Sequence, residues 1–492
     1  MSVKLSIAAL ARLPAGVAAP KYQRSDLKPG ILHIGVGNFH RAHQAVYLDD
    51  LFNIGVDHDW ALVGAGVREP DVDMRAKLEA QDWLTTVVEQ EAGQSTVRVT
   101  GAMIDFIPPF DVEAMLSRLA KPEIRIVSLT VTEGGYYISP ATQRFDPAHP
   151  DIVHDAKHAA QPKTAFGLIA AGLKRRRAQG VPPFTVMSCD NIPGNGHVTE
   201  NAVAGLAELS DPELAQWIRK SVAFPNSMVD RITPATTERE RAILRESHGV
   251  EDSWPVFCEA FRQWVVEDRF PSGRPALEKV GVTFTADVAP YELMKIRILN
   301  GGHAAIAYPA GLLDIHFVHE AMEDKQIPIF LETLEKREVL PVVPPPPQVD
   351  LEAYRKKVAE RFANPKIGDT ISRLCLDGSN RQPKFILPTV RDRLAGGASV
   401  KGLALVSAMW CRYCAGESES GKVIPPNDPS WDRLQAAAKP ARDDPRAFLA
   451  MRDIFGELAD NPAYVAAFST ALGSLWTKGV RATLGDYLEG KA

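Results

Sequence analysis

A lysine, an asparagine and a histidine stand close together in the second half of the chain. Lys295, Asn300 and His303 occur in a stretch without proline, residues 291–307, whose composition predicts a helix. At about 100° per residue, an α-helix places the three side chains within roughly 140° of arc, and Glu292 falls in the same arc. Asparagine, Gly301-Gly302 and histidine are poor choices for an ordinary exposed helix face. The spacing therefore favours a half-dry cleft over a solvated surface.

These residue types fit the oxidation of a secondary alcohol. A lysine in dry surroundings has a lowered pKa, so Lys295 could take the hydroxyl proton while hydride leaves the carbon. Amide groups of Asn300 and of Asn191, which follows the strand expected over residues 184–189, could donate to the developing alkoxide. His303 could fix the same oxygen or hold another substrate hydroxyl. We predict a dehydrogenase site without a metal.

Hydride transfer requires a redox partner, and a glycine turn near the N-terminus predicts one. Gly35-Val-Gly37-Asn38-Phe39-His40 follows the first expected strand and opens a helix. Glycines at that point let the backbone approach a pyrophosphate group, as in dinucleotide-binding folds. His40 stands in place of the third glycine of the fingerprint, so the match is partial. An ordinary strand–helix turn is the alternative interpretation.

An acidic residue after the second strand bears on the choice of cofactor. Glu69 and Asp71 follow the strand expected over residues 60–64, and either could bind the ribose hydroxyls of NAD. Arg68 could instead tolerate the 2′-phosphate of NADP. The sequence favours NAD and leaves the identity of the ribose-binding acid open.

The elements that must position these residues show two patterns. Up to about residue 285, short β-branched runs alternate with helical stretches, which predicts a doubly wound, mostly parallel Rossmann-like sheet. From residue 286 onwards the strand signal fades and helical periodicity dominates. We predict an α/β dinucleotide-binding domain over residues 1–285 and a mostly α-helical substrate-binding domain over residues 286–492. The expected strands are 31–35, 60–64, 97–100, 124–132 and 184–189, and the expected helices include 111–120, 163–179, 327–337, 350–362, 399–415, 445–458 and 462–477.

Composition narrows the function classes. The 492 residues carry 56 Lys and Arg against 61 Asp and Glu, so no basic excess predicts nucleic-acid binding. No apolar run approaches the roughly 18–20 residues that span a bilayer. The five cysteines are few for the length and odd in number, which predicts reduced thiols in a cytoplasmic protein. Cys411 and Cys414 share a helical run and are expected to be core thiols, not a zinc site.

The chain resembles the mannitol dehydrogenase family, the long-chain polyol-specific dehydrogenases. The resemblance is carried by seven segments that occur in family order along most of the chain: 35–44, 128–136, 184–191, 224–234, 295–303, 373–379 and 383–388. The family's own glycine turn lacks the third glycine, so His40 does not depart from its pattern.

This resemblance implies a two-domain, NAD-dependent secondary alcohol dehydrogenase that needs no metal. It implies Lys295 as the base and Asn191 with Asn300 as the clamp on the alkoxide. It implies further that His303, Asp230 and Arg373 hold substrate hydroxyls. The cofactor-binding residues expected are Gly35, Gly37, Asn38, Phe39, Glu69, Asp71 and Asp190. Glu292 and Glu133 are candidates to relay the proton to solvent.

The expected reaction is oxidation of a sugar alcohol such as D-mannitol to the ketose, D-fructose, and its reverse. Reduction of a hexuronate, fructuronate to D-mannonate, is an alternative that would need an inward-facing arginine such as Arg373 or Arg297. D-Arabinitol and D-sorbitol are further possible substrates. A dinucleotide-binding regulator without activity is disfavoured, because Lys295, Asn191, Asn300 and His303 are all present.

Overall fold

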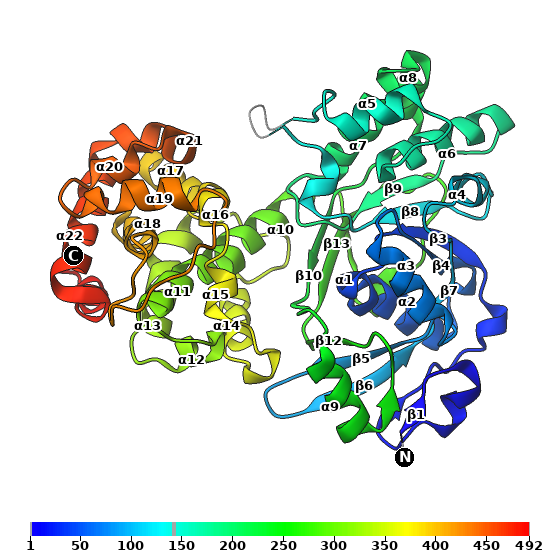
Figure 1. Cartoon of the computed structure of the whole chain (residues 1–492), viewed down its shortest axis with the longest axis horizontal. Helices are drawn as coiled ribbons and strands as arrows, with labels where there is room; N and C mark the ends of the chain where they lie inside the picture. The colour runs from blue at the N-terminus through cyan, green and yellow to red at the C-terminus, as the bar shows by residue number, and fades with distance from the viewer. Residues whose placement is uncertain (1, 140–143, 492) are drawn as a thin grey trace. The chain divides into compact units, whose positions relative to one another are not determined.

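In the computed structural model, which describes residues 2–139 and 144–491, the chain divides into two compact units, Met1–Ala289 and Pro290–Ala492. The boundary expected after residue 285 lies shortly before this division. Among the described residues, the strands belong to the first unit, and long helices fill the second (Figure 1).

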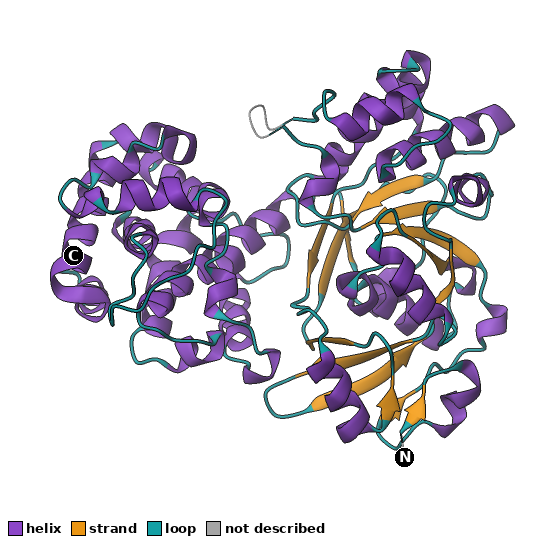
Figure 2. Ribbon diagram, viewed as in Figure 1, coloured by secondary structure: helices purple, strands orange, loops and turns teal. Residues whose placement is uncertain are grey.

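A five-stranded parallel sheet forms the centre of the first unit (Figure 2). Its strands are β3 (Pro29–Ile34), β4 (Ala61–Ala65), β7 (Met103–Phe106), β8 (Ile126–Leu129) and β9 (Thr185–Ser188), in the spatial order β7-β4-β3-β8-β9. All neighbouring pairs are parallel. The first of these strands, β3, is central, and the chain crosses over it between β7 and β8. Ligands of such sheets bind at the carboxyl ends of the strands beside this crossing.

Helices cover both faces of this sheet, which confirms the predicted doubly wound fold. Leu32 and Ile34 of β3 belong to the core that packs on α4 (Val112–Leu119), α6 (Ala165–Gln179), α7 (Asn195–Glu208) and α8 (Pro212–Ser221). Ile31 belongs to the core that packs on α2 (Gln44–Asn53). Strands buried on both faces read as continuous apolar runs, and this is why the sequence revealed them. The helices of this unit are α1 (Asn38–Ala42), α2 (Gln44–Asn53), α3 (Pro70–Glu79), α4 (Val112–Leu119), α5 (Pro150–Lys157), α6 (Ala165–Gln179), α7 (Asn195–Glu208), α8 (Pro212–Ser221) and α9 (Glu238–His248).

One predicted strand lies outside the central sheet. The run at 97–100 is part of β6 (Ser95–Thr100), which pairs antiparallel with β5 (Thr85–Gln90) in a separate sheet completed by β12 (Val256–Glu259) and β2 (Val17–Ala18). Val97 and Val99 are buried while Thr96 and Arg98 are not, an alternation typical of a strand with one solvated face. The smaller sheets contain β10 (Ser227–Asp230), β13 (Gln263–Glu267) and β14 (Thr283–Thr285), and β1 (Val3–Lys4) and β11 (Val250–Glu251).

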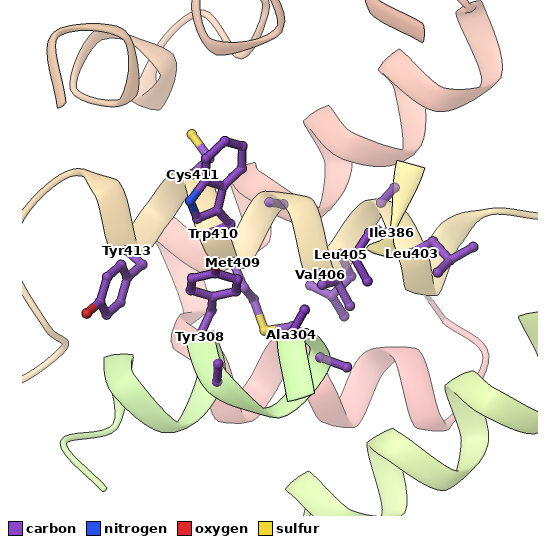
Figure 3. Close-up of a cluster of buried hydrophobic side chains, with 14 of the residues drawn as sticks. Ala304, Tyr308, Ile386, Leu403, Leu405, Val406, Met409, Trp410, Cys411 and Tyr413 are labelled. Carbon is purple, nitrogen blue, oxygen red and sulfur yellow. The ribbon is translucent and has the colours of Figure 1, made fainter. Parts of the chain in front are cut away.

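The second unit is helical, as predicted, and its described residues contain no strand longer than an isolated bridge. α18 (Lys401–Cys414) is buried along most of its length and packs on α11 (Gly301–Leu312), with Tyr308 and Ala304 facing Met409 in Figure 3. The other α-helices are α10 (Ala289–Met294), α12 (Val318–Glu323), α13 (Ile327–Leu334), α14 (Leu351–Phe362), α15 (Ile371–Leu374), α16 (Gly378–Phe385), α17 (Leu387–Ala395), α19 (Trp431–Ala438), α20 (Arg446–Leu449), α21 (Arg452–Phe455) and α22 (Pro462–Leu488).

Two predicted helices in the C-terminal part of this unit differ from the observed ones. The stretch 445–458 is broken into α20, α21 and a 3₁₀ turn, because Met451 leaves helical geometry and Gly456 has a φ of +58°. α22 continues beyond residue 477 to Leu488, with a break at Gly479, whose φ is +82°. Glycine adopts positive φ values without strain, so each helix is interrupted at or next to a glycine.

No helix among the described residues combines the length and apolar composition that crossing a bilayer requires. All five cysteines are buried and unpaired with one another. Cys411 and Cys414 lie inside α18, which confirms their interpretation as core thiols.

Candidate active site

The glycine turn joins β3 to α1 at the carboxyl edge of the central sheet. Gly35 has a φ of +96°, and a Cβ there would lie 2.2 Å from the carbonyl oxygen of Thr130, so only glycine fits. Gly37 is different, because a Cβ at this residue would have no heavy atom closer than 3.9 Å. The first glycine thus shapes the turn, and the second leaves its backbone open to a ligand.

The residues after the turn are held by the protein itself. Asn38 donates to Thr236 Oγ1 at 3.1 Å and accepts from Arg41 at 2.7 Å, so its side chain is engaged within the unit. The ring of Phe39 stacks on that of His43, with 4.8 Å between ring centroids. His40, in the place of the third glycine, is buried and stacks on His33 at 3.5 Å. Burial holds the pKa of His40 well below its ordinary value, with the neighbouring charges of His33 and Arg41 adding to the effect.

The two acids after β4 differ in their surroundings. Asp71 is buried, and its Oδ2 accepts hydrogen bonds from the backbone N–H groups of Val67 and Arg68 at 2.9 and 2.8 Å. This carboxylate therefore fixes the turn between β4 and α3. Glu69 stands exposed at the end of the same turn, just before Pro70 begins α3.

The loops after β8 and β9 are joined by Asp190. Its carboxylate accepts from the backbone N–H groups of Val131 and Thr132 at 3.0 and 2.9 Å and from the Tyr136 hydroxyl at 2.7 Å. Thr132 has a φ of +65°, which is costly for a β-branched residue, and these bonds hold it there. Asn191, the next residue along, is exposed at the same edge of the sheet.

Two further predicted residues belong to the first unit. Asp230 is the last residue of β10 and is buried, opposite Gln263 of β13. Glu133 begins the 3₁₀ turn Glu133–Tyr136, and its side chain lies outside the described part of the structure.

In the second unit, Lys295 and Asn300 bound a π-helical segment between α10 and α11. The backbone N–H of Gly301 reaches the carbonyl of Ile296, five residues earlier. The prediction of one uninterrupted α-helix over 291–307 is therefore wrong at these six residues. An α-helix would set residues five apart about 140° from each other. Closure from i to i+5 instead places Asn300 one turn beyond Lys295 on the same side.

Lys295 is 7% exposed, so its stem and amine lie mostly out of water. Glu292 occupies the preceding turn, on α10, and is half-buried. Asn300 is also half-buried and directly precedes Gly301-Gly302. The segment therefore offers a sheltered amine and an amide on one side of a helix.

His303 lies on α11 in a cationic environment. Its ring stacks on Phe362 with 4.1 Å between centroids, and its Nε2 has no hydrogen-bond partner among the described residues. Burial lowers its pKa well below the ordinary value, and the charges of Arg373, Arg361 and Arg381 lower it further. The imidazole is therefore neutral and has a nitrogen available for a hydroxyl group.

The two arginines considered for substrate binding differ in position. Arg373, on α15, is half-exposed and forms a bidentate ion pair with Asp369, with Nε 2.5 Å from Oδ1. Arg297 is 6% exposed and is engaged by Thr389 and Asp392 at 2.7 and 2.8 Å. Arg373 can therefore meet a ligand, whereas Arg297 stabilises the helices around it.

Several residues of these regions were not predicted from the sequence. Arg361 and Arg381 lie near enough to His303 to shift its pKa, but they occur on separate helices with no motif between them. Glu335 is buried beside Gly302. Its spacing from Leu331 and Leu334 follows the buried face of α13, and this signal could have revealed it.

Within the described ranges, no three histidine, cysteine or acidic side chains are grouped as a metal site would require.

Comparison with known proteins matches both units of the chain. Residues 29–279 match the family description "Mannitol dehydrogenase Rossmann domain", and residues 287–476 match "Mannitol dehydrogenase C-terminal domain". A mannitol 2-dehydrogenase of Cereibacter sphaeroides is 58% identical over 473 residues, covering 96% of this chain and 99% of that protein. One from Pyricularia oryzae is 39% identical, with 99% of each chain covered.

Two solved structures agree with the fold over nearly the whole chain. The Pseudomonas fluorescens mannitol 2-dehydrogenase, in a ternary complex with NAD and D-mannitol, is 44% identical with a TM-score of 0.89, covering 99% of this chain and 100% of that one. A D-sorbitol dehydrogenase in substrate-free form is 36% identical with a TM-score of 0.91, covering 98% and 100%.

Proposed function

Since this chain belongs to the mannitol dehydrogenase family, we propose that it is an NAD-dependent secondary alcohol dehydrogenase. It oxidises a polyol such as D-mannitol at C2 to the ketose, D-fructose, and catalyses the reverse reduction. The likeness to a structure that holds NAD and D-mannitol supports this assignment. The first unit is the dinucleotide-binding domain, and the second supplies the base and most substrate contacts.

The residues of the glycine turn fit NAD. The open space at Gly37 is where a Cβ would obstruct a pyrophosphate, and the turn lies at the edge of the sheet where dinucleotides bind. Asn38 and Phe39 then contribute through their backbone, because Asn38's side chain is engaged elsewhere. Of the two acids, exposed Glu69 is free of the turn-fixing role of Asp71 and is the better candidate for the ribose hydroxyls. Asp190 supports the cofactor indirectly, by holding the loop after β8.

Lys295 is the general base. When bound, NAD supplies the carbon that accepts the hydride. The sheltered amine of Lys295 removes the hydroxyl proton from the carbon that is oxidised, and in the reverse direction the ammonium returns it. Glu292, one turn before Lys295, and Glu133 are candidates to pass that proton to solvent.

Asn300 and Asn191 stabilise the alkoxide. Their amide groups donate hydrogen bonds to the oxygen as it loses its proton, and such donors contribute most where water is excluded. The π-helical segment sets Asn300 on the side of Lys295, which suits two groups that act on the same oxygen. Neutral His303, Asp230 and Arg373 bind the other hydroxyl groups of the polyol.

A second candidate function has a specific observation in its favour. Arg361, Arg373 and Arg381 surround His303 with positive charge, and such charge would also attract a carboxylate. This favours hexuronate reduction, fructuronate to D-mannonate, as the alternative. Arg373's bidentate pairing with Asp369 counts against it, because that pair already neutralises one of the three arginines.

The buried cysteines bear on the cellular compartment of the protein. Five buried cysteines without a disulfide suit a reducing compartment, so we place the enzyme in the cytoplasm, acting on small sugar alcohols and ketoses.

Absorbance of the reduced nicotinamide tests the proposal directly. We expect oxidation of D-mannitol with NAD to be fastest among D-mannitol, D-sorbitol, D-arabinitol and D-mannonate, each tried with NAD and with NADP. Faster turnover of D-mannonate would replace the proposal with the hexuronate alternative. No turnover of any of them, with NADH still bound, would indicate a regulator that has lost activity.

A further inference from the structure

A small cavity lies in the second unit beside the segment that joins Asn300 to His303. Its volume is about 10 Å³, which is close to the least that one water molecule requires. Arg297, Thr389, Glu335 and Gly301-Gly302 are among its lining residues. The rest of its wall is apolar: Leu331, Leu334, Val339, Phe385, Ile386 and Leu403. A water there would pair with the Glu335 carboxyl group, whose oxygens have no hydrogen-bond partner among the described residues.

Glu335 is the unusual member of this wall. The side chain is 1% exposed, and neither carboxyl oxygen has a hydrogen-bond partner among the described residues. Burial raises its pKa well above the ordinary value, and this outweighs the attraction of Arg355, while Glu352 and Glu332 repel the charged form. Buried polar groups are nearly always satisfied, so an exception calls for an explanation such as a bound water or a role at a functional site.

The carboxyl group lies directly against the catalytic segment. A Cβ on Gly302 would be 3.1 Å from Glu335 Oε1 and 3.3 Å from the ring of Phe362, which stacks on His303. Glu335 also begins a second π-helical segment, Glu335–Val339, which contacts the first one, Lys295–Asn300. π-Helical turns occur often at functional sites. The two π-helical segments are in contact, and the carboxyl group of Glu335 lies against Gly302 of the helix that carries His303.

We propose that Glu335 is a positioning residue for the reaction: its carboxyl group, with one water in the cavity, holds the Gly301-Gly302 backbone and thereby sets Asn300 and His303. This inference rests on the proposed function, because Asn300 and His303 act there on the substrate. A hydrogen-bonding group at residue 335 is then required, and its negative charge is not.

Substitution of Glu335 separates this role from a purely structural one. E335L replaces an unsatisfied buried acid with an apolar side chain of similar size, so the melting temperature should rise. We expect kcat for D-mannitol oxidation to fall about 10–100-fold, since misplacement by about 1 Å can cost that much. NADH affinity should not change. E335Q, which keeps the hydrogen-bonding groups, should retain kcat within about twofold.

Glu338 provides the matched control. It lies in the same π-helical segment and is buried, but it accepts hydrogen bonds from the backbone of Gly402 and Leu403 at 2.7 and 3.0 Å. E338L should therefore lower the melting temperature and leave kcat unchanged. Wild-type kcat in E335L, or an equal loss in E335Q and E335L, would overturn the proposal. If E335L does not fold, G302A, which displaces the carboxyl group, must lower kcat instead.

A readout without substrate distinguishes failure of this inference from failure of the proposed function. In protein labelled with nitrogen-15 histidine, E335L should shift the His303 ring resonances, whereas E338L should not. If the wild-type enzyme oxidises no polyol, the proposed function fails and this spectrum alone tests the positioning role. An unshifted His303 in E335L would then reject it.

Discussion

The π-helical segment determines how the side chains of Lys295 and Asn300, five residues apart, are oriented relative to each other. On an α-helix, this spacing would turn the amide away from the amine by about 140°. In the segment Lys295–Asn300 the two side chains occur one turn apart on one side. A base and a hydrogen-bond donor must reach the same oxygen, so the wider turn serves the chemistry.

Replacing Lys295 by alanine tests the base. We expect turnover of D-mannitol to fall by about two to four orders of magnitude, which is the usual contribution of a positioned general base. Wild-type oxidation should also rise with pH, since only the unprotonated amine accepts a proton, and the variant should lose this dependence. Steady-state rates across pH measure both effects, and NADH fluorescence titration is the control for cofactor binding. Undiminished turnover would remove Lys295 from the mechanism.

Buried histidines predict how stability depends on pH. His33, His40 and His43 are buried in the segment that runs from β3 to the start of α2, and burial lowers the pKa of His33 and His43 to about 3. As the pH falls below about 6.5, the unfolded chain takes up protons that the native state refuses. The free energy of unfolding should therefore decrease between pH 7 and pH 5, by about 2 kcal/mol for each histidine.

Urea denaturation at several pH values measures this slope. His40→Gln removes one titrating ring. The decrease in the free energy of unfolding between pH 7 and pH 5 should therefore be smaller by about 2 kcal/mol in this variant. A free energy of unfolding that stays constant from pH 7 to pH 5 would contradict the prediction. Buried Glu335, whose pKa is raised, changes the slope in the opposite direction, so the difference in slope between the wild type and His40→Gln isolates the histidine contribution.

At the scale of elements, the strand–turn–helix unit uses its two glycines differently. Gly35→Ala should destabilise the fold. The positive φ alone costs about 1 kcal/mol for alanine, and the contact of the added methyl group with the Thr130 carbonyl oxygen adds to this cost. Gly37→Ala should fold normally, since its methyl enters open space, but should weaken NADH binding.

The two variants control for each other. Thermal unfolding reports the first effect, and fluorescence titration with NADH reports the second. Gly37→Ala with unchanged NADH affinity would show that the dinucleotide does not approach this backbone.

Strands buried on both faces could be predicted from the sequence, whereas local departures from regular helix geometry could not. The strands β3, β4, β8 and β9 followed from continuous apolar runs, and α4 and α6 followed from the helix-like stretches between them. In the structure, the side chains of Asp111 and Thr164 cap these two helices. The residue pattern around Lys295 is compatible with an ordinary α-helix, so it did not indicate the π-helical turn. The same holds for the charge around His303, since Arg361 and Arg381 reach it from distant parts of the chain.

At the scale of the molecule, the chain contains two separate sets of cores. One cluster gathers the buried apolar residues of the helical unit, Met294 to Tyr487, and the others lie within the first unit. Domains with their own cores can unfold separately, so a ligand held mainly by one need not stabilise the other.

NADH should therefore protect the two units unequally from hydrogen exchange. At a concentration about 100 times its Kd, a ligand stabilises the state that binds it by about 2.7 kcal/mol. We expect slower amide exchange in β3, β4 and the turn between β3 and α1, and little change in α18 and α22, which lie in the core of the other unit. Exchange measured by mass spectrometry with and without NADH tests this, with Gly37→Ala as the control that should lose the protection. Equal protection of α18 and α22 would mean that the two cores unfold as one cooperative unit.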